Sequence, residues 1–537
     1  VWNPWRPTPF LDGSIRTMRQ KFLTFITLLC CHHVSSFNIL AIASQPFKSH
    51  YMAFGPLFRE LANRGHTVTV INNYPDAVPM NNLTFINLNT PPLHNGTAAI
   101  DYEHINSDLQ RIINSYRHLS FGPRAMKIDC ESLFTHKDVV DHLARGIKYD
   151  VIFVEQFMGD CALAYAATMY DAPIIGITSH VLLPWTYTRM GIPFNFAADA
   201  FYFSSAGTNP SLYHKVEAKV TNWFLTTFAK WYVHGVIDEV YKEFLPRAKI
   251  DIDKIAKERM RMIFAYQHFS LTGTRVMSQQ ILEIGGLHIR EPKPLSEVSR
   301  FLSTAEHGAI YVSFGSNIKA NSMSKHKMQQ FLDAFKKIPQ KIIWKWEDNS
   351  LPGDNDNVFT QAWLPQVDIL CHPKVLAFVS HGGMLSLSET AYCGKPLITI
   401  PFFGDQFTNS AVAQQLGLGK MIYFSQLNTE TLVAAIKELT SQKMQDAAKK
   451  VKSLWHDRPQ PAMESAIYWT EYVARHRDSP SHLPSLNNTW LEELQLDVSV
   501  IIIALLITLL LTLYTILRLV FSYLIFKIVK SKKDKIN

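Results

Sequence analysis

The stretch from Trp363 to Asn409, WLPQVDILCHPKVLAFVSHGGMLSLSETAYCGKPLITIPFFGDQFTN, constrains the fold of this chain most. Within it, residues 375–379 form an apolar run with two Val, which predicts a strand buried in a parallel sheet. The tetrapeptide SHGG (380–383) follows, and then a helix-compatible segment, 385–392. Glycines in a strand-to-helix turn let the backbone approach a phosphate, and the helix N-terminus offers free N–H groups. The turn is therefore typical of a phosphate site, although an ordinary tight βα turn has the same glycines.

Three side chains in this stretch suit a base and a ribose. Trp363 offers a flat face on which a base can stack and Gln366 offers an amide, unless Trp363 is simply a core residue. Glu389 lies about two helical turns beyond His381, where its carboxylate can accept from both hydroxyls of a ribose. Most Glu residues lie instead on a solvated helix face, so the spacing alone does not decide its role.

The end of the stretch predicts polar side chains for a sugar. Residues 397–401, LITIP, read as a second strand, and Asp405 and Gln406 follow it. We therefore expect both side chains at the carboxyl end of the sheet, where open α/β folds bind their ligands.

A second βαβ pattern lies near the start of the chain. Residues 37–43 are a β-branched apolar run, 52–63 are helix-compatible up to Gly65, and 66–71 read as the next strand. His50 falls on the first loop of this unit, again at the carboxyl end of a sheet. Because imidazole titrates near neutral pH, His50 can take the proton of a hydroxyl, although most of the 21 His in the chain will be structural.

A histidine base needs a carboxylate that orients its ring and stabilises the imidazolium. The predicted strand 150–154 ends at Glu155, and Asp160 follows five residues later. Either carboxylate can do this electrostatic work. Both residues therefore remain candidates for the partner of His50.

Taken together, these motifs resemble the signature block of the UDP-glycosyltransferase family. The resemblance implies an α/β fold of the GT-B type, with two facing Rossmann-like domains and a cleft between them. It implies a UDP-sugar as co-substrate, with no bound cofactor and no metal. HGGMLS together with FFGDQFTN is similar to the insect branch of the family, which usually prefers UDP-glucose.

The resemblance also implies roles for single residues. His50 matches the position of the catalytic base, and Glu155 that of its partner, where the family usually has the Asp that Asp160 would retain. Vertebrate and plant members usually have Asn at the position of Leu385, so that phosphate contact is absent and Ser386 is a candidate to replace it. The implied UDP-sugar contacts are Trp363 for uracil, Gln366 and Glu389 for the ribose, Ser316, His381, Gly382 and Gly383 for the diphosphate, and Asp405 with Gln406 for the sugar hydroxyls.

The implied reaction is a direct displacement. His50 would deprotonate a small lipophilic acceptor, whose oxygen attacks the anomeric carbon and inverts an α-linked donor, as in detoxification. The leaving UDP would be stabilised by the glycine turn, and the sequence has neither a DxD-like pair closely followed by a His nor a CxxC spacing. Two alternatives stay open: a transferase that acts on a lipid such as ceramide or a sterol, and a non-catalytic membrane-tethered binder.

The two ends of the chain predict a single-pass type I protein of the endoplasmic reticulum membrane, in contact with membrane lipid. Residues 18–36 combine a basic start with an apolar core and predict a cleaved signal peptide, while 1–17 read as an upstream extension outside the fold. Residues 498–517 carry no charge and, at about 1.5 Å each, span a bilayer core of about 30 Å. The basic tail 518–537 is then cytoplasmic, and its terminal KDKIN resembles a retrieval signal for the endoplasmic reticulum.

Charge argues against nucleic acid as a partner. Residues 1–36 hold four Lys or Arg and one Asp, and 518–537 hold six and one, which accounts for the whole net charge of +8. The region between them is neutral and therefore does not attract nucleic acid electrostatically. This region is predicted to be lumenal and contains three glycosylation sequons, at Asn82, Asn95 and Asn487.

The neutral region is long enough for two domains. The predicted division is an acceptor-binding domain at 37–285, a linker at 286–299, a UDP-sugar-binding domain at 300–455, and helices that pack back with a stalk at 456–497. The aromatic-rich segment 180–270 predicts core packing for most of its rings, with some lining an apolar acceptor pocket. Four Cys remain outside the signal peptide, too few for a disulfide scaffold, and the oligomeric state, a homo-oligomer included, stays open.

Overall fold

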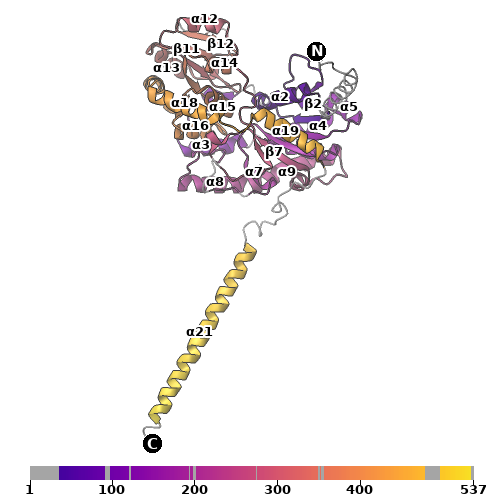
Figure 1. Ribbon diagram of the computed structural model, residues 1–537, viewed down its shortest axis with the longest axis vertical. Helices are drawn as coiled ribbons and strands as arrows, with labels where there is room; N and C mark the ends of the chain where they lie inside the picture. Colours follow the sequence, from indigo (N-terminus) through magenta and orange to yellow (C-terminus); the bar gives the residue numbers. More distant parts are fainter. Residues whose placement is uncertain are drawn as a thin grey trace, which may run out of the picture.

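The computed structural model describes residues 36–90, 97–119, 122–192, 194–196, 201–273, 275–348, 351, 356–477 and 496–533. The predicted upstream extension, all but the last residue of the predicted signal peptide, and the sequons at Asn95 and Asn487 lie outside these residues. Within them, two sheets with flanking helices form one body, and a long helix extends from it at the C-terminal end (Figure 1).

The first sheet has seven strands in the order β3-β2-β1-β5-β6-β7-β8, and every pair is parallel. Its strands are β1 (Asn38–Ala43), β2 (Thr67–Asn72), β3 (Leu83–Asn87), β5 (Val151–Glu155), β6 (Ile174–Thr178), β7 (Met260–Ala265) and β8 (Ile281–Glu283). In β1, Ile39 and Ala41 pack in one apolar cluster, and Leu40 and Ile42 pack in another. Successive side chains of a strand point to opposite faces, so both faces of this sheet are buried and its strands read as continuous apolar runs.

Helices from distant parts of the chain cover the two faces of this sheet. One cluster contains buried residues of α2 (Lys48–Asn63) and α19 (Ala462–Arg475), and the other contains those of α4 (Gly122–Thr135), α6 (Asp160–Met169), α9 (Lys230–Phe244) and α10 (Ile252–Arg259). The remaining helical segments that precede the second sheet in the sequence are η1 (Ala99–Tyr102), α3 (Asp108–Leu119), α5 (Lys137–Ala144), α7 (Pro184–Arg189), α8 (Leu212–Phe224), η2 (Leu225–Ala229) and α11 (Phe269–Thr272). Of these, η1 and α11 pack their buried apolar residues in the clusters of the second sheet. Although α19 follows the second sheet in the sequence, Ala466 and Ile467 pack in the core of the first.

The second sheet has six strands in the order β12-β11-β9-β13-β14-β15, and its pairs are also parallel. Its strands are β9 (Ala309–Ser313), β11 (Lys341–Lys345), β12 (Val358–Gln361), β13 (Val375–Ser380), β14 (Leu397–Thr399) and β15 (Gly419–Met421). Its helical segments are α12 (Glu297–Ser303), η3 (Ala320–Ser322), α13 (Lys325–Lys336), α14 (Gln366–Leu370), α15 (Met384–Cys393), α16 (Gln406–Gln415), η4 (Phe424–Gln426), α17 (Thr429–Leu439) and α18 (Gln442–His456). A short parallel pair, β4 (Thr97–Ala98) with β10 (Ile318–Lys319), joins the two halves.

Two disulfides join helices of the body. Cys130 and Cys161 connect α4 to α6 with a Cα–Cα distance of 5.5 Å, and Cys371 and Cys393 connect the ends of α14 and α15 with 4.7 Å. The sequence alone did not predict which of the four cysteines pair. The second bond lies at the C-terminal end of α15, the end away from the glycine turn that precedes this helix.

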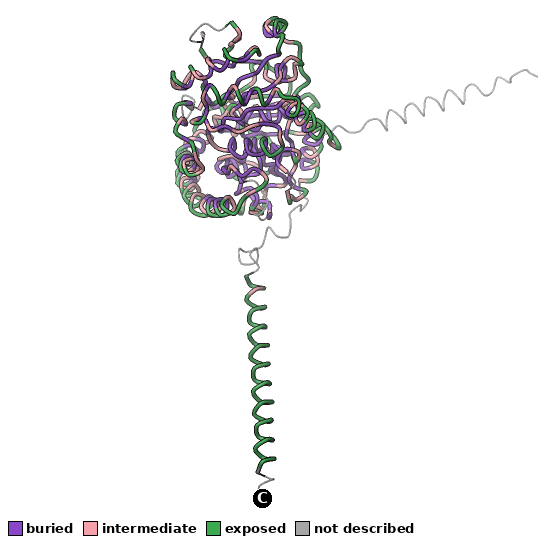
Figure 2. The backbone as a smooth tube through the Cα atoms, turned by 90° about the vertical axis from the view of Figure 1, so that its left-hand side faces the viewer, coloured by how far each residue is buried: buried purple, intermediate pink, exposed green. Residues whose placement is uncertain are grey.

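The helix α21 (Leu496–Lys533) is exposed along nearly all of its length (Figure 2). Among the described residues, it is the one helix long and apolar enough to cross a membrane. It contains the predicted span 498–517 and continues through the apolar segment 519–526.

Candidate active site

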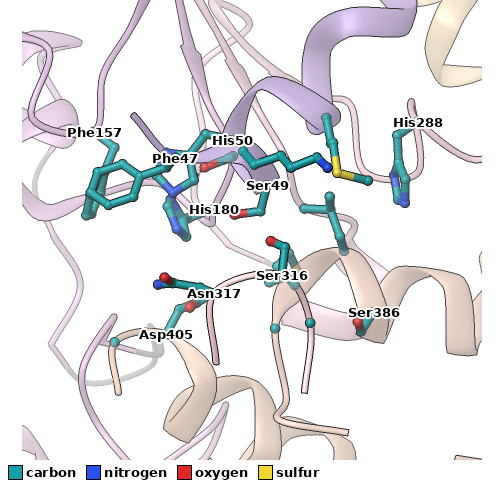
Figure 3. A pocket seen from close by; sticks show the side chains of 18 of the residues that line it. Phe47, Ser49, His50, Phe157, His180, His288, Ser316, Asn317, Ser386 and Asp405 are labelled. Carbon is teal, nitrogen blue, oxygen red and sulfur yellow. The ribbon is translucent and has the colours of Figure 1, made fainter. Parts of the chain in front are cut away.

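The carboxyl ends of the two sheets open onto a cleft of about 1520 Å³. Of the residues singled out in the sequence, those that line the cleft are His50, Asp160, Ser316, Trp363, Gln366, His381, Gly383, Ser386, Glu389, Asp405 and Gln406. Glu155 and Gly382 lie directly behind this lining. His50 projects from one wall and Asp405 from the other (Figure 3). Residues more than 300 positions apart in the sequence therefore share one cavity.

His50 lies in the first turn of α2 and not on the loop before it. The helix begins at Lys48, because the carbonyl of Phe47 accepts from the N–H of His50 at 3.1 Å and from that of Tyr51 at 3.4 Å. This corrects the expectation that the helix would start at residue 52. The imidazole still lies at the carboxyl end of β1, as the βαβ pattern predicted.

The carboxylate of Glu155, the last residue of β5, holds the His50 ring. Nδ1 of His50 lies 2.5 Å from Oε1 of Glu155, and both side chains are buried. The rings of Phe47, Phe157 and His180 enclose the imidazole, with centroids 4.9, 5.0 and 4.7 Å from its own. Because Nδ1 is held by Glu155, Nε2 is the nitrogen left for a substrate.

The burial of this pair controls how it titrates. Burial lowers the pKa of His50 to about 3 and raises the pKa of Glu155 well above its ordinary value. Below the raised pKa of Glu155, the two groups therefore share one proton, and the pair has no net charge. Loss of that proton leaves a carboxylate that accepts from Nδ1–H of His50 and a lone pair on Nε2 that can act as a base.

Asp160, the other candidate partner, is bonded elsewhere. Its carboxylate accepts from the Arg189 guanidinium at 2.7 Å and contacts Nε2 of His234 at 3.1 Å. Burial alone would raise the pKa of Asp160, but Arg189 and His234 outweigh burial and hold it below its ordinary range. Among the described residues, Glu155 is the carboxylate hydrogen-bonded to His50.

A second histidine beside His50 was not predicted. His180 follows β6, and its ring meets that of His50 edge-on with centroids 4.7 Å apart. Oγ of Ser179 lies 3.0 Å from its Nδ1. Burial lowers the pKa of His180 well below its ordinary value, and His50 adds to this effect. The only sequence signal for His180 is its place just after a strand, which no motif marks.

The turn between β13 and α15 packs tightly around His381. Gly382 has a φ of 84° and Gly315, in the turn after β9, has a φ of 79°, values that strain any residue with a Cβ. A Cβ on Gly315 would lie 2.7 Å from the His381 imidazole, and one on Gly383 would lie 2.4 Å from it. Glycine is therefore required for two turns to approach one imidazole. The first N–H groups of α15 follow directly, at the place where a phosphate binds to a helix N-terminus.

His381 is available to a ligand. Its Nδ1 is buried and has no hydrogen-bond partner among the described residues. Burial lowers the pKa of His381 to about 4, with a further contribution from Lys345, so the ring is neutral at neutral pH and retains one N–H donor. Ser316 lines the same part of the cleft. A buried, unpaired ring nitrogen beside a helix N-terminus fits a phosphate oxygen as its missing partner.

Glu389 belongs to a hydrogen-bonded chain at one end of the cleft. Its Oε1 lies 3.0 Å from Nε2 of His288, and its Oε2 accepts from the Gln366 amide. The same amide donates to Oγ of Ser386 at 3.0 Å. Ser386, a candidate phosphate contact, is thus hydrogen-bonded to Gln366, which was expected at the ribose. His288 lies in the predicted linker 286–299, where no motif indicated a functional residue.

Trp363 is exposed on the cleft and is not a core residue. Its side chain is 49% exposed, and Nζ of Lys48 lies 4.1 Å from the centroid of its ring. Lys48 is the first residue of α2, so this contact connects a helix of the first sheet to the loop between β12 and α14 of the second. An exposed indole at the edge of a cleft is a suitable surface for a stacked base.

Asp405 and Gln406 lie where α16 begins. Oε1 of Gln406 accepts from the backbone N–H groups of Phe402 and Phe403 at 2.8 and 3.2 Å, so its carbonyl fixes the turn and its amide N–H groups remain. The Asp405 carboxylate accepts from Asn409 at 2.8 Å. Burial raises the pKa of Asp405 to about 7, against the opposing effect of Asn409. Asp405 therefore changes its charge near neutral pH.

Near the glycine turn, the described residues provide backbone N–H groups and Lys345 as groups that can face an anion, and no cluster that could hold a metal. Among them, no group of three or more His, Cys, Asp or Glu side chains could hold a metal ion. Lys345 lines the cleft, and its Nζ lies 2.9 Å from Glu347. Positive charge at this end of the cleft thus comes from Lys345 and from the N-terminus of α15.

Known proteins are similar to this chain over most of its length. The family model for UDP-glucoronosyl and UDP-glucosyl transferases matches residues 38–535. The chain belongs to this family. UDP-glycosyltransferase UGT5 of Dactylopius coccus is 30% identical over 514 residues, which cover 94% of this chain and 96% of that protein. UDP-glucosyltransferase 2 of the same organism is 29% identical over 470 residues, which cover 86% and 88%.

A solved structure confirms the expected fold. A UDP-glucosyltransferase from Polygonum tinctorium, in complex with 3,4-dichloroaniline, aligns with a TM-score of 0.55 over 83% of this chain and 100% of its own, at 14% identity. The two facing Rossmann-like domains of the GT-B type are thus confirmed. Family membership makes the chain a UDP-glycosyltransferase, an enzyme that uses a UDP-sugar.

Replacing each carboxylate by its amide, one at a time, distinguishes the two candidate partners of the base. We expect Glu155→Gln to lower the turnover of this UDP-glycosyltransferase by orders of magnitude, as loss of an orienting carboxylate does in hydrolases, by about 10⁴. Asp160→Asn should leave turnover per folded molecule within a few-fold but lower thermal stability by about 3 kcal/mol, because Arg189 loses its buried counter-ion. Turnover normalised to UDP binding, together with thermal melts, measures both effects. The opposite ranking of turnover would transfer the role to Asp160.

The same pair predicts the pH dependence of the enzyme. Because the pKa of Glu155 is raised, the base form of the pair exists only above that raised value. We expect kcat/KM to fall on acidification with a midpoint well above 4.5, the ordinary pKa of a Glu. The residual activity of Glu155→Gln should lack this acid limb. A midpoint at or below pH 4.5 would contradict the assignment.

Proposed function

We propose that this UDP-glycosyltransferase transfers glucose from UDP-glucose, with inversion, to a hydroxyl of a small lipophilic acceptor, and that it serves detoxification. The observation that carries the proposal is the buried His50–Glu155 pair on the wall of the cleft opposite Asp405 (Figure 3). A base on one wall and a phosphate turn with sugar-binding groups on the other form the arrangement that a direct displacement requires.

The donor lies along the wall of the second sheet in this proposal. Uracil stacks on Trp363, and the ribose hydroxyls contact Glu389 and Gln366, which are already joined by a hydrogen bond. The sugar hydroxyls contact Asp405 and the free amide N–H groups of Gln406. The diphosphate is held by Ser316, His381, the N–H groups of the Gly382-Gly383 turn and the start of α15.

The transfer is a single displacement. Nε2 of His50 takes the proton of the acceptor hydroxyl, and the oxygen forms a bond to the anomeric carbon from the face opposite UDP. The bond between that carbon and the phosphate oxygen breaks, and its electron pair leaves with UDP. The carboxylate of Glu155 stabilises the imidazolium that results. The N–H groups around His381 receive the growing charge on the leaving diphosphate.

The acceptor side of the cleft has many apolar side chains among its charged and polar ones. Beyond His50, the lining side chains include Met126, Phe157, Met158, Trp185 and Leu225. Such a lining retains an apolar acceptor by burial and leaves its hydroxyl to the polar end of the cleft. This composition supports a lipophilic acceptor over a sugar or a peptide.

The cellular setting is part of the proposal. We place the body in the lumen of the endoplasmic reticulum, with α21 spanning its membrane once and the basic tail in the cytoplasm. Asn82 is exposed, with a φ of 61° in a turn before β3, and is therefore accessible for glycosylation. The signal peptide, the other two sequons and a homo-oligomer stay predictions.

Removing the base tests the mechanism. We expect His50→Ala to abolish glucosyl transfer but to preserve UDP binding, because base and donor groups lie on opposite walls. Calorimetric titration with UDP and a turnover assay on the same preparation measure both properties. Turnover within a few-fold of the parent would remove His50 from the mechanism.

The reaction should not depend on a divalent cation. The proposed stabilisation of the leaving UDP comes from N–H groups and His381, so excess EDTA should leave the rate nearly unchanged. The control is a parallel assay with added Mg²⁺ or Mn²⁺. A rate that collapses with EDTA and returns only with the metal would contradict the mechanism.

The charge of Asp405 predicts which donor is used and at which pH. Above its pKa of about 7, Asp405 is ionised and repels the carboxylate of a glucuronate donor; below that pH it is protonated and the repulsion is lost. Among the described residues, no Lys or Arg forms an ion pair with Asp405 that would offset this effect. We therefore expect a preference for UDP-glucose over UDP-glucuronate that grows from pH 6 to pH 8.

The measurement is kcat/KM for UDP-glucose, UDP-glucuronate and UDP-galactose with a mixed set of phenol and steroid acceptors, read by mass spectrometry. Asp405→Asn is the matched control, because it retains the shape but cannot ionise, and its donor ratio should not change with pH. Equal or inverted values for UDP-glucose and UDP-glucuronate at pH 8 would defeat the proposed donor. Transfer of no sugar to any of these acceptors would defeat the proposed function.

A further inference from the structure

A long apolar surface on α8, η2 and α9 is not explained by the cleft. These three segments follow one another without interruption from residue 212 to residue 244. Their large exposed apolar side chains, which we call the apolar ridge, are Leu212, Tyr213, Val216, Val220, Trp223, Phe228, Trp231 and Tyr232.

The ridge reverses the usual pattern of a surface helix. A helix on a globular body normally buries its large apolar residues and exposes its polar ones. In α8 the buried residues are Glu217, Ala218 and Thr221, whereas Trp223 is 64% exposed. In α9, Trp231 is 70% exposed. Packing within the body therefore does not account for these side chains, and a contiguous exposed apolar surface of this kind indicates a partner.

The exposed positions follow one face of the helix. Positions 212, 216, 220 and 223 recur every three to four residues, and after the π turn of η2 the series continues at 228, 231 and 232. At about 1.5 Å per residue, the ridge is about 30 Å long. A continuous stripe of this length suits a planar partner better than a small ligand.

The charges beside the ridge suit anionic or zwitterionic headgroups. Lys215 and Lys219 lie between ridge residues along α8. The one acidic residue between 212 and 233, Glu217, is buried and forms a bidentate ion pair with Arg111. The ridge also contains two Trp and two Tyr, residues that are enriched where a membrane meets water.

The ridge lies at the end of the molecule from which the membrane helix extends. Figure 1 shows α8 and α9 at the lower end of the body, on the side of α21. A body tethered to a bilayer by α21 meets that bilayer at a high effective concentration, so even a modest apolar contact would be populated. A soluble partner would lack this advantage.

We propose that the apolar ridge is a second membrane contact, which lies in the headgroup and acyl boundary of the bilayer that α21 spans. The opposite side of the same helical segment reaches the active site, since Leu225, Ala229 and Val233 line the cleft. The ridge thus places the acceptor side of the cleft next to the bilayer. Resting on the proposed function, we further infer that lipophilic acceptors reach His50 from the membrane.

Lipid-dependent quenching on the full chain tests the contact, because α21 alone would keep the protein in vesicles. Val220→Cys carries an environment-sensitive fluorophore on the ridge, and Val78→Cys carries it at an equally apolar, exposed position away from the ridge. Each protein is reconstituted in phosphatidylcholine vesicles with 20 mol% phosphatidylserine, with and without lipids spin-labelled high in the acyl chain. The parent chain, treated with the same dye, gives the background.

We expect the probe at position 220 to shift its emission to the blue and to be quenched by the spin-labelled lipid, and the probe at position 78 to do neither. Equal quenching at the two positions would overturn the proposal. A blue shift at 220 without quenching by lipid, which disappears on dilution of the protein in lipid, would also overturn it and assign the ridge to a second copy of this chain.

A double variant tests the acceptor route separately. Trp223→Ser with Trp231→Ser should raise KM several-fold for an acceptor that partitions into the bilayer, and leave kcat/KM for a water-soluble phenol unchanged within twofold. Equal effects on the two acceptors would reject the route, while the quenching result still decides the membrane contact. Loss of transfer to every acceptor in the parent chain would reject the proposed function and leave the contact unaffected.

Discussion

The chemistry of this molecule depends on two parallel sheets whose carboxyl ends face the same cleft. A parallel strand delivers its following loop to one edge of the sheet, so residues from β1, β5, β9, β13 and β14 gather there without being neighbours in sequence. The first sheet contributes His50 and Glu155, and the second contributes His381 and Asp405. The return of α19 packs its buried face in the core of the first sheet, and the Cys371–Cys393 bond joins the C-terminal ends of α14 and α15 in the second.

Burial gives the ionisable groups of the cleft their chemical character. It keeps His381 neutral as a donor, brings the pKa of Asp405 to about 7, and makes His50 and Glu155 titrate as one unit. Asp160 is equally buried, yet its bond to Arg189 holds its pKa low. The groups whose pKa is shifted by burial can exchange protons or bind a ligand, whereas the carboxylate of Asp160, held in an ion pair, stabilises the structure.

Local patterns in the sequence predicted what lies within one βα unit. The strand, glycine turn and helix around His381 are such a unit, and the family model and the solved structure confirm the fold. Contacts between units were not predictable: no motif marks His180 or His288, and Lys48 meets Trp363 only when the two sheets face each other. The bond between His50 and Glu155 is also of this kind: the resemblance favoured Glu155 by its position, but the sequence did not decide between Glu155 and Asp160.

The segment 180–270 shows how composition can mislead about environment. Its aromatic residues predicted core packing for most rings, and Phe201 and Tyr241 are indeed buried. Trp223 has the same apolar character, yet it faces outward on α8, where Glu217 is paired with Arg111 inside the body; Trp231, on α9, is exposed as well. The buried ion pair, with Ala218 and Thr221, thus turns this face of α8 inward. An apolar stripe predicts that one face of a helix is in contact with something apolar. Whether that face contacts the protein core or lipid depends on which face the ion pair turns inward.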